Sequence, residues 1–177
     1  EERTKKAVST ADKKLFIGFA QKYPLTILVA EDNIVNQTLA VRALKKLGYE
    51  PSVAENGLLA IEEIAKTFYD VIFMDVQMPE LDGLDTTRYI RKIEGKQPII
   101  IAMTANAMAG DKEICLQAGM DDYVTKPIQL DDIVKAPVDA QPLHEAERHR
   151  TAVQLRTGVL KDMRFDRRRG EVAERRI

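Results

Sequence analysis

Residues 71–83 of this 177-residue chain read V-I-F-M-D-V-Q-M-P-E-L-D-G, and the prediction of the fold starts from them. Four apolar residues, 71–74, run directly into Asp75, and a Met-Pro pair and a glycine follow. A short apolar run of this kind predicts a strand buried on both faces of a parallel sheet. A carboxylate at the end of such a strand is costly to desolvate, so its presence requires an explanation. It can cap a helix, be anchored by hydrogen bonds, or take part in chemistry.

Around this strand, short β-branched runs alternate with amphipathic stretches of helical spacing. The predicted strands are 26–30, 51–54, 70–75, 98–103 and 122–125, and the predicted helices are 34–47, 57–67, 84–93, 107–117 and 129–136. Five strand–helix units in succession predict an α/β fold, with a parallel sheet, right-handed crossovers and helices on both faces. The apolar strands at 71–74 and 99–102 favour central positions, whereas Pro51 and Ser52 favour an edge.

The composition changes on both sides of this region. We predict a linker from an upstream domain at 1–24, one folded domain at 25–136, and an Arg-rich tail at 137–177. Prolines break the last helix early, and the tail has too few apolar residues for a core, so we expect it to be disordered or partly helical. A basic interaction arm is the alternative for the tail. Because the sequence does not start with methionine, we expect it to be a piece of a longer protein.

The totals argue against several classes of protein. The net charge of -1 gives no electrostatic reason to expect binding to nucleic acid or to a membrane surface. The apolar runs are far shorter than the roughly 20 residues of a membrane span, and no signal peptide is visible. The one cysteine, Cys115, cannot form an internal disulfide, which fits a reducing compartment. We therefore expect a cytoplasmic domain, and the sequence leaves open a parent protein that is anchored in a membrane.

Charged and polar residues follow four of the five predicted strands, at the edge where doubly wound sheets bind their ligands. They are Glu31 and Asp32, Asp75, Thr104, and Lys126. Three carboxylates in a small volume repel one another, and a hard divalent cation such as Mg²⁺ relieves that repulsion. A metal, a lysine and a hydroxyl group together can stabilise a phosphoryl group in transfer, and a carboxylate can be the nucleophile.

Each of these residues also has a purely structural explanation when it is taken alone. Asp32 or Asn33 can cap the first helix, Thr104 can belong to a cap or a strand ladder, and Lys126 can be a solvated surface lysine. Their coincidence at the same strand ends favours a shared site.

Four motifs occur in the order and with the spacing of one known family. L-V-A-E-D-N (28–33), F-M-D-V-Q-M-P-E-L-D-G (73–83), I-A-M-T-A-N-A-M (101–108) and Y-V-T-K-P (123–127) resemble the receiver domain of two-component response regulators. The resemblance covers roughly residues 25–135. E-D-N-x-V-N-Q and M-T-A-N-A-M look most like the C-terminal receiver of hybrid sensor histidine kinases. The resemblance implies a flavodoxin-like fold, with five parallel strands in the order 2-1-3-4-5.

For the chemistry, the resemblance implies that Asp75 is the phosphoacceptor and that Lys126 contacts the phosphoryl oxygens. It implies that Mg²⁺ is held by Glu31, Asp32, Asp75 and the backbone carbonyl of Gln77.

For the response to phosphorylation, the resemblance implies a switch. Thr104 moves to hydrogen-bond the phosphoryl group, and Tyr123 turns inward when it does. Gln77 and Asn106 stand at positions that tune the lifetime of the phosphoryl group, and the peptide bond before Pro127 is expected to be cis.

The implied function is to take a phosphoryl group from a phosphohistidine in a phosphorelay, so the expected partner is a histidine kinase or a phosphotransfer domain. The domain would catalyse only its own phosphorylation and dephosphorylation, and the parent protein would be a kinase. A homodimer is compatible with the sequence, although the early end of the last helix argues against one through the face built from 107–117, 122–125 and 129–136.

Two other classes were weighed. A Mg²⁺-dependent phosphohydrolase of the haloacid dehalogenase type also uses an aspartate nucleophile at a strand end, with a Thr or Ser and a Lys. That class needs a second aspartate where this chain has Gln77, so turnover of external phosphate esters should be poor. A flavodoxin-like FMN protein needs a Ser/Thr-rich phosphate loop after the first strand, and E-D-N at 31–33 would repel a phosphate.

Overall fold

The computed structural model of the chain describes residues 19–105, 109–129, 133, 165–166 and 171–172. One parallel sheet carries the fold. Its strands are β1 (Ile27–Ala30), β2 (Ser52–Ala54), β3 (Val71–Asp75), β4 (Ile99–Thr104) and β5 (Asp122–Thr125), in the spatial order β2-β1-β3-β4-β5. The predicted strand order, the edge position of β2 and the central positions of β3 and β4 are all confirmed.

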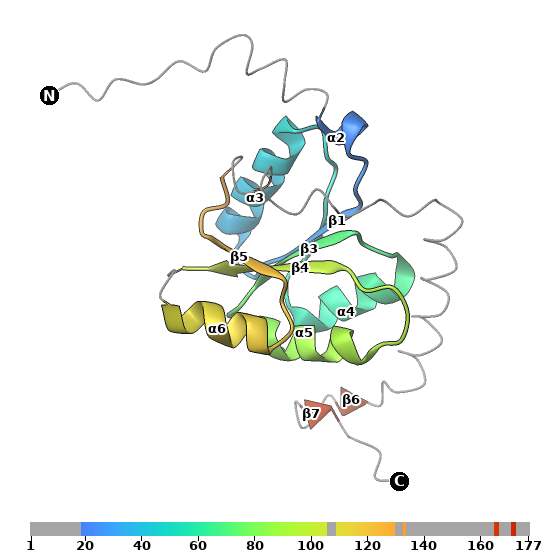
Figure 1. Cartoon of the computed structure of the whole chain (residues 1–177), viewed down its shortest axis with the longest axis vertical. Helices are drawn as coiled ribbons and strands as arrows, with labels where there is room; N and C mark the ends of the chain where they lie inside the picture. Colours follow the sequence, from blue (N-terminus) through green and yellow to red (C-terminus); the bar gives the residue numbers. More distant parts are fainter. Residues whose placement is uncertain (1–18, 106–108, 130–132, 134–164, 167–170, 173–177) are drawn as a thin grey trace, which may run out of the picture.

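Helices cover both faces of the sheet, as predicted. Figure 1 shows α3 (Ile34–Lys46) on one face and α4 (Gly57–Lys66), α5 (Gly83–Lys92) and α6 (Ala109–Gln117) on the other. Of the predicted helix at 129–136, the structure describes only Gln129 and Ile133. The amide of Ile133 donates to the carbonyl of Gln129, at 3.4 Å.

The alternation of side chains along the strands divides the core into two clusters. Leu28, Ile72 and Met74 belong to the cluster under α4 and α5, whereas Val29 and Phe73 belong to the cluster under α3. All five residues of β3 are buried, which explains the continuous apolar run that precedes Asp75.

Side-chain caps fix where three of the helices begin. Asn33 caps α3, and its side chain accepts a hydrogen bond from the amide of Val35 at 2.9 Å. Asn56 caps α4, and Asp82 caps α5 by accepting from the amide of Asp85 at 2.8 Å. Because Asn33 takes the cap of α3, the neighbouring Asp32 is not needed there.

The end of the predicted linker packs on the domain. Helix α2 (Phe19–Lys22) lies beside the C-terminal end of α3, where the amide of Ala20 donates to the carbonyl of Leu47 at 3.0 Å. The hydroxyl of Tyr49 donates to the carbonyl of Tyr23 at 2.7 Å, and the ring of Phe19 lies against both tyrosine rings. Residues 1–18 lie outside the described part of the chain.

Of the predicted tail, the structure describes only two short strands. They are β6 (Phe165–Asp166) and β7 (Glu171–Val172), which form an antiparallel pair. The prediction for the tail named no strand, and its other residues lie outside the described part. Among the described residues, no helix combines the length and the apolar character that crossing a bilayer requires.

Candidate functional site

The pairing of β1 with β3 brings two carboxylates together at the C-terminal edge of the sheet. Ala30 pairs with Met74, so Glu31 and Asp75, one residue further along each strand, are neighbours. Alternation along β3 places Asp75 on the same side of the sheet as Phe73, which is the side that α3 covers. Both carboxylates are buried.

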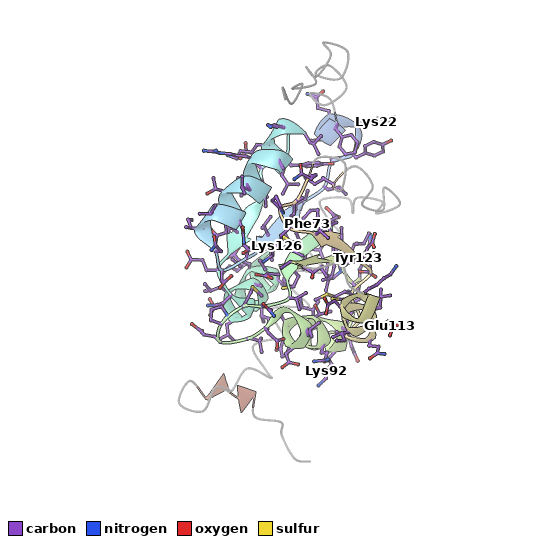
Figure 2. All side chains as sticks on the ribbon, turned by 90° about the vertical axis from the view of Figure 1, so that its left-hand side faces the viewer. Lys22, Phe73, Lys92, Glu113, Tyr123 and Lys126 are labelled. Carbon is purple, nitrogen blue, oxygen red and sulfur yellow. The ribbon has the colours of Figure 1, made fainter. Side chains whose placement is uncertain are left out.

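Lys126 reaches these carboxylates from the loop after β5. Its Nζ lies 2.6 Å from Oδ2 of Asp75 and 2.8 Å from Oε2 of Glu31. Burial by itself would lower the pKa of Lys126, but the hydrogen bonds and the charges of Asp75 and Glu31 outweigh it and leave the pKa raised. The lysine is therefore held as an ammonium ion. Figure 2 is viewed from the side of the molecule on the left of Figure 1, and the label of Lys126 lies near the centre of that view.

Asp75 is buried, and this burial is the main reason why its pKa is raised. The hydrogen bond from Lys126 and the one from the amide of Gln77, 3.1 Å from Oδ1, oppose the shift, whereas the charge of Glu31 adds to it. A carboxylate with a raised pKa holds protons more tightly than an ordinary aspartate, and it is a stronger base.

Glu31 is fixed by amide groups at the start of α3. Its Oε1 accepts hydrogen bonds from Nδ2 of Asn36 at 2.9 Å and from the amide of Asn33 at 3.3 Å. Its backbone carbonyl accepts one from Nε2 of the buried Gln37 at 2.6 Å. Its Oε2 is buried and accepts no hydrogen bond of good geometry from the described residues, although the ammonium of Lys126 is close. Asn36 and Gln37 close the motif E-D-N-x-V-N-Q at 31–37, but no role was predicted for either of them.

The acidic residues fit a divalent cation. Glu31, Asp32 and Asp75 each offer an oxygen atom, and these atoms lie within 4.8 Å of one another. Oxygens bound to one Mg²⁺ lie at most about 4.2 Å apart, so a small contraction or a bridging water completes the fit. Lys126 pairs with two of these three carboxylates, so the lysine and the three acids together have a formal excess of two negative charges. The buried Oε2 of Glu31, which is in contact with the ammonium of Lys126 but accepts no well-directed hydrogen bond from the described residues, is a suitable ligand atom.

The structure places the remaining predicted residues around this cluster. Thr104 ends β4, and its carbonyl accepts from the amide of Lys126 at 2.8 Å. Tyr123 lies on β5 and is half-buried, with Nζ of Lys112 4.9 Å from the centre of its ring. The bond before Pro127 is cis, as the resemblance implied. Gln77 is exposed, and the predicted tuning residue Asn106 lies outside the described residues.

Known proteins share this arrangement. Residues 27–137 match the family model described as the response regulator receiver domain, which is more than half of the chain. The chain belongs to this family. Its five-stranded parallel sheet has the fold of a receiver.

The relatives of this receiver are long signalling kinases. Histidine protein kinase 1 of Candida albicans is 40% identical over 127 residues, which are 66% of this chain and 5% of that protein. Hybrid signal transduction histidine kinase I of Dictyostelium discoideum is 45% identical over 127 residues, 67% of this chain and 7% of that protein. The chain thus spans only a small part of the curated relatives that it matches.

Among solved structures, this receiver is similar to the receiver domain of the sensor histidine kinase PA1611 from Pseudomonas aeruginosa PAO1. The two are 45% identical, the TM-score is 0.58, and the match covers 63% of this chain and 92% of that one. That structure has a magnesium ion coordinated in its active-site cleft. The receiver domain of Ssk1 from Saccharomyces cerevisiae, solved with the histidine phosphotransfer protein Ypd1, is 31% identical with a TM-score of 0.58, and the match covers 63% of this chain and 84% of that one.

Membership of the receiver family also bears on the hydrolase alternative. Gln77 stands two residues after Asp75, where the hydrolase would carry its second aspartate. Neither the family nor the relatives described above favour the hydrolase.

Proposed function

We propose that Asp75 of this receiver accepts a phosphoryl group from a phosphohistidine in a histidine kinase or a phosphotransfer domain. The observation that carries the proposal is the buried carboxylate of Asp75 at a strand end, 2.6 Å from the ammonium of Lys126 and inside a cluster of three acids. The structure of a receiver in complex with a phosphotransfer protein supports this choice of partner.

In the proposed reaction an oxygen of Asp75 attacks the phosphorus atom, and the bond from phosphorus to the histidine nitrogen breaks. The imidazole keeps the electron pair of that bond and takes up a proton. Lys126 is placed to pair with a phosphoryl oxygen, because its ammonium already lies between Asp75 and Glu31.

Mg²⁺ is the proposed cofactor, and Glu31, Asp32, Asp75 and the backbone carbonyl of Gln77 are its proposed ligands. When bound, the cation offsets negative charge on the phosphoryl group. The magnesium in the similar Pseudomonas receiver supports the choice of metal. The pairing of β1 with β3 and the hydrogen bond from Asn36 to Glu31 fix the positions of Glu31 and Asp75 at the carboxyl edge of the sheet.

The response to phosphorylation is proposed to pass through Thr104 and Tyr123. Phosphorylation adds about -1.5 to -2 charges, which favours a state in which hydroxyl and ammonium groups face the phosphoryl group. Thr104 ends β4, and Tyr123 on the neighbouring β5 pairs with Ala102, two residues before Thr104, so alternation along the strands places Thr104 and Tyr123 on the same face of the sheet. We also propose that the parent protein is a hybrid histidine kinase, as the relatives named above are.

Phosphorylation by acetyl phosphate tests the proposal, because it needs no partner protein. With Mg²⁺ present, the chain should incorporate one base-labile, acid-stable phosphoryl group, and EDTA or Asp75→Ala should abolish it. Many turnovers of a generic phosphomonoester per chain would instead support a hydrolase.

The start of α3 offers a contact surface for the phosphohistidine partner. Ile34 and Val35 are 68% and 61% exposed, although both are large apolar residues, and only Asn33 separates them from the acidic pair Glu31 and Asp32. Val35→Glu should slow phosphotransfer from a phosphotransfer protein that phosphorylates the wild-type chain, by about tenfold if Val35 contributes as a central interface residue does. The rate with acetyl phosphate should not change. Equal slowing with both donors would contradict this role.

A further inference from the structure

Glu31 differs from the other two acids of the cluster in how firmly it is held. It is 1% exposed, and its backbone carbonyl and its Oε1 both accept hydrogen bonds from α3. Asp32 is exposed, and no hydrogen bond or ion pair is described for it. Asp75 is held by Lys126 and by the amide of Gln77. Glu31 alone among the three is oriented by side-chain amides.

The two side-chain amides come from adjacent positions in the first turn of α3. Asn33 caps the helix and ends the extended backbone that leaves β1. The helix then turns Asn36 and Gln37 back over Glu31, five and six residues after it in the sequence. Gln37 is buried, at 7% exposure, so its amide must be satisfied within the protein.

The two oxygens of the Glu31 carboxylate have different surroundings as a result. Oε1 accepts from Asn36 at 2.9 Å and from the amide of Asn33 at 3.3 Å. Oε2 is buried, lacks a well-directed hydrogen bond and faces Lys126 at 2.8 Å. If the carboxylate were rotated by half a turn, the two oxygens would merely exchange places. Loss of the Asn36 contact, however, would leave Oε1 with only the longer hydrogen bond from the amide of Asn33, so the side chain would be held less firmly.

We propose that Asn36 and Gln37 are positioning residues of the metal site: Asn36 fixes the side chain of Glu31 and Gln37 fixes its backbone, so that the carboxylate is held beside Asp75 for the proposed Mg²⁺. The inference rests on the proposed function, because it concerns the proposed Mg²⁺ ligand Glu31. Hydrogen-bond partners that orient a metal ligand typically change metal affinity by 10- to 100-fold when they are removed, although they touch no metal themselves.

Binding of Mg²⁺ to the unphosphorylated chain, measured by titration calorimetry, tests the inference without any activity. Asn36→Ala should weaken Mg²⁺ binding by about tenfold, and Gln37→Met should weaken it in the same direction. Thr38→Ala is the matched control, because the Thr38 hydroxyl donates only to the carbonyl of Ile34, at 2.7 Å on the same helix. The control should bind Mg²⁺ as the wild type does.

The Mg²⁺ dependence of phosphorylation by acetyl phosphate separates positioning from a general loss of structure. Asn36→Ala should raise the half-saturating Mg²⁺ concentration by about tenfold and leave the rate at saturating Mg²⁺ within about twofold of the wild type. A lower saturating rate with an unchanged half-saturating concentration would overturn the inference, and so would equal weakening in Thr38→Ala. Asn36 is only partly buried, so its variant should fold even if Gln37→Met does not.

The outcomes for the inference and for the proposed function can be told apart. If the wild-type chain binds Mg²⁺ and is phosphorylated, but Asn36→Ala binds Mg²⁺ equally well, only the positioning role of Asn36 and Gln37 is wrong. If the wild-type chain neither binds Mg²⁺ nor accepts a phosphoryl group, the proposed function fails, and the inference fails with it.

Discussion

The loop after Asp75 ends at Gly83, which packs directly against the end of β3. A Cβ atom at position 83 would overlap the backbone carbonyl oxygen of Asp75 and would lie 3.0 Å from Cγ of Met74. The amide of Gly83 donates to the carbonyl of Val76 at 3.1 Å, which closes the loop. Glycine at 83 therefore lets the first turn of α5 lie directly against the residue that we propose as phosphoacceptor.

Replacement of Gly83 should consequently cost stability. Gly83→Ala should lower the free energy of unfolding by about 1–3 kcal/mol, the usual range for overpacking, because backbone atoms cannot move aside as flexible side chains do. Gly110→Ala is the control: position 110 lies in α6, and a Cβ there meets no atom of the described residues within 4 Å. It should raise stability by up to about 1 kcal/mol, since alanine favours a helix over glycine. Urea unfolding measures both, and equal effects of the two changes would contradict the packing argument.

The charged residues of the site could be predicted from the sequence, whereas the roles of the residues that support them could not. Glu31, Asp75 and Lys126 stand directly after strands, so the sheet order alone predicts that they meet. Asn36 and Gln37 belong to the motif E-D-N-x-V-N-Q, but the motif alone does not indicate what their side chains contact. Their amide side chains, in the first turn of α3, were a possible signal, because amides can donate hydrogen bonds to an acidic residue nearby. Only the path of the backbone from β1 into α3 shows that they reach Glu31.

At the scale of elements, the hydroxyl of Tyr49 is one of the hydrogen-bond donors that join α2 and the residue after it to the C-terminal end of α3; another is the amide of Ala20. Tyr49 is 4% exposed, and its hydroxyl donates to the carbonyl of Tyr23. Burial, and to a smaller extent the charge of Tyr23, raise the pKa of Tyr49 to about 12. Ionisation of Tyr49 would break this hydrogen bond and place a charge in the core.

The raised pKa of Tyr49 predicts that the folded protein becomes less stable as the pH rises into the alkaline range. Unfolded tyrosine ionises near pH 10, and the folded pKa is about 12, so the contribution of Tyr49 is complete below pH 10 and is lost as the pH rises through 12. Wild-type chain should lose up to about 2–3 kcal/mol over this range relative to Tyr49→Phe, which cannot ionise. Urea unfolding of both proteins between about pH 9 and 12, the range in which tyrosine ionises here, measures this loss of stability. A constant difference between the two would contradict the shift.

The elements themselves were predictable because their hydrophobic periods are unambiguous. The predicted strand 70–75 and the observed Val71–Asp75 differ by one residue, because Asp70 is a buried acid that ties the start of β3 to the amide of Thr26 at 2.7 Å. The predicted helix 84–93 begins at Gly83, directly after its cap Asp82. The packing of α2 was less predictable, since L-F-I-G-F-A at 15–20 indicates an apolar contact but does not indicate what it contacts.

At the scale of the whole molecule, the end of the sheet opposite the site is held together by Arg91 at the end of α5. Its guanidinium donates to the carbonyls of Gly119 and Pro98, each at 2.8 Å, and to Oδ2 of Asp121 at 2.6 Å. Pro98 and Asp121 directly precede β4 and β5. Asp75 lies at the other end of these strands, roughly 17 Å away for a strand of this length.

This separation predicts that stability and metal binding can be changed independently. Arg91→Ala should lower the free energy of unfolding by about 1–3 kcal/mol, because carbonyl groups lose their donors, and should leave Mg²⁺ affinity unchanged. Arg88→Ala is the control, since Arg88 makes only an exposed ion pair with Asp85 and its loss should change little. Urea unfolding and calorimetric titration with Mg²⁺ test the pair. A large loss of Mg²⁺ affinity in Arg91→Ala would show that the two ends are coupled.

The position of the phosphoryl group tests the central claim most directly. After reaction with acetyl phosphate and Mg²⁺, borohydride reduces an aspartyl phosphate to homoserine, and peptide mass spectrometry then identifies the converted residue. We predict homoserine at position 75 and at no other aspartate, with no conversion when Mg²⁺ is withheld. Conversion at Asp32 or at another aspartate, or a phosphoryl group found on serine, threonine or histidine, would contradict the assignment of Asp75 as the phosphoacceptor.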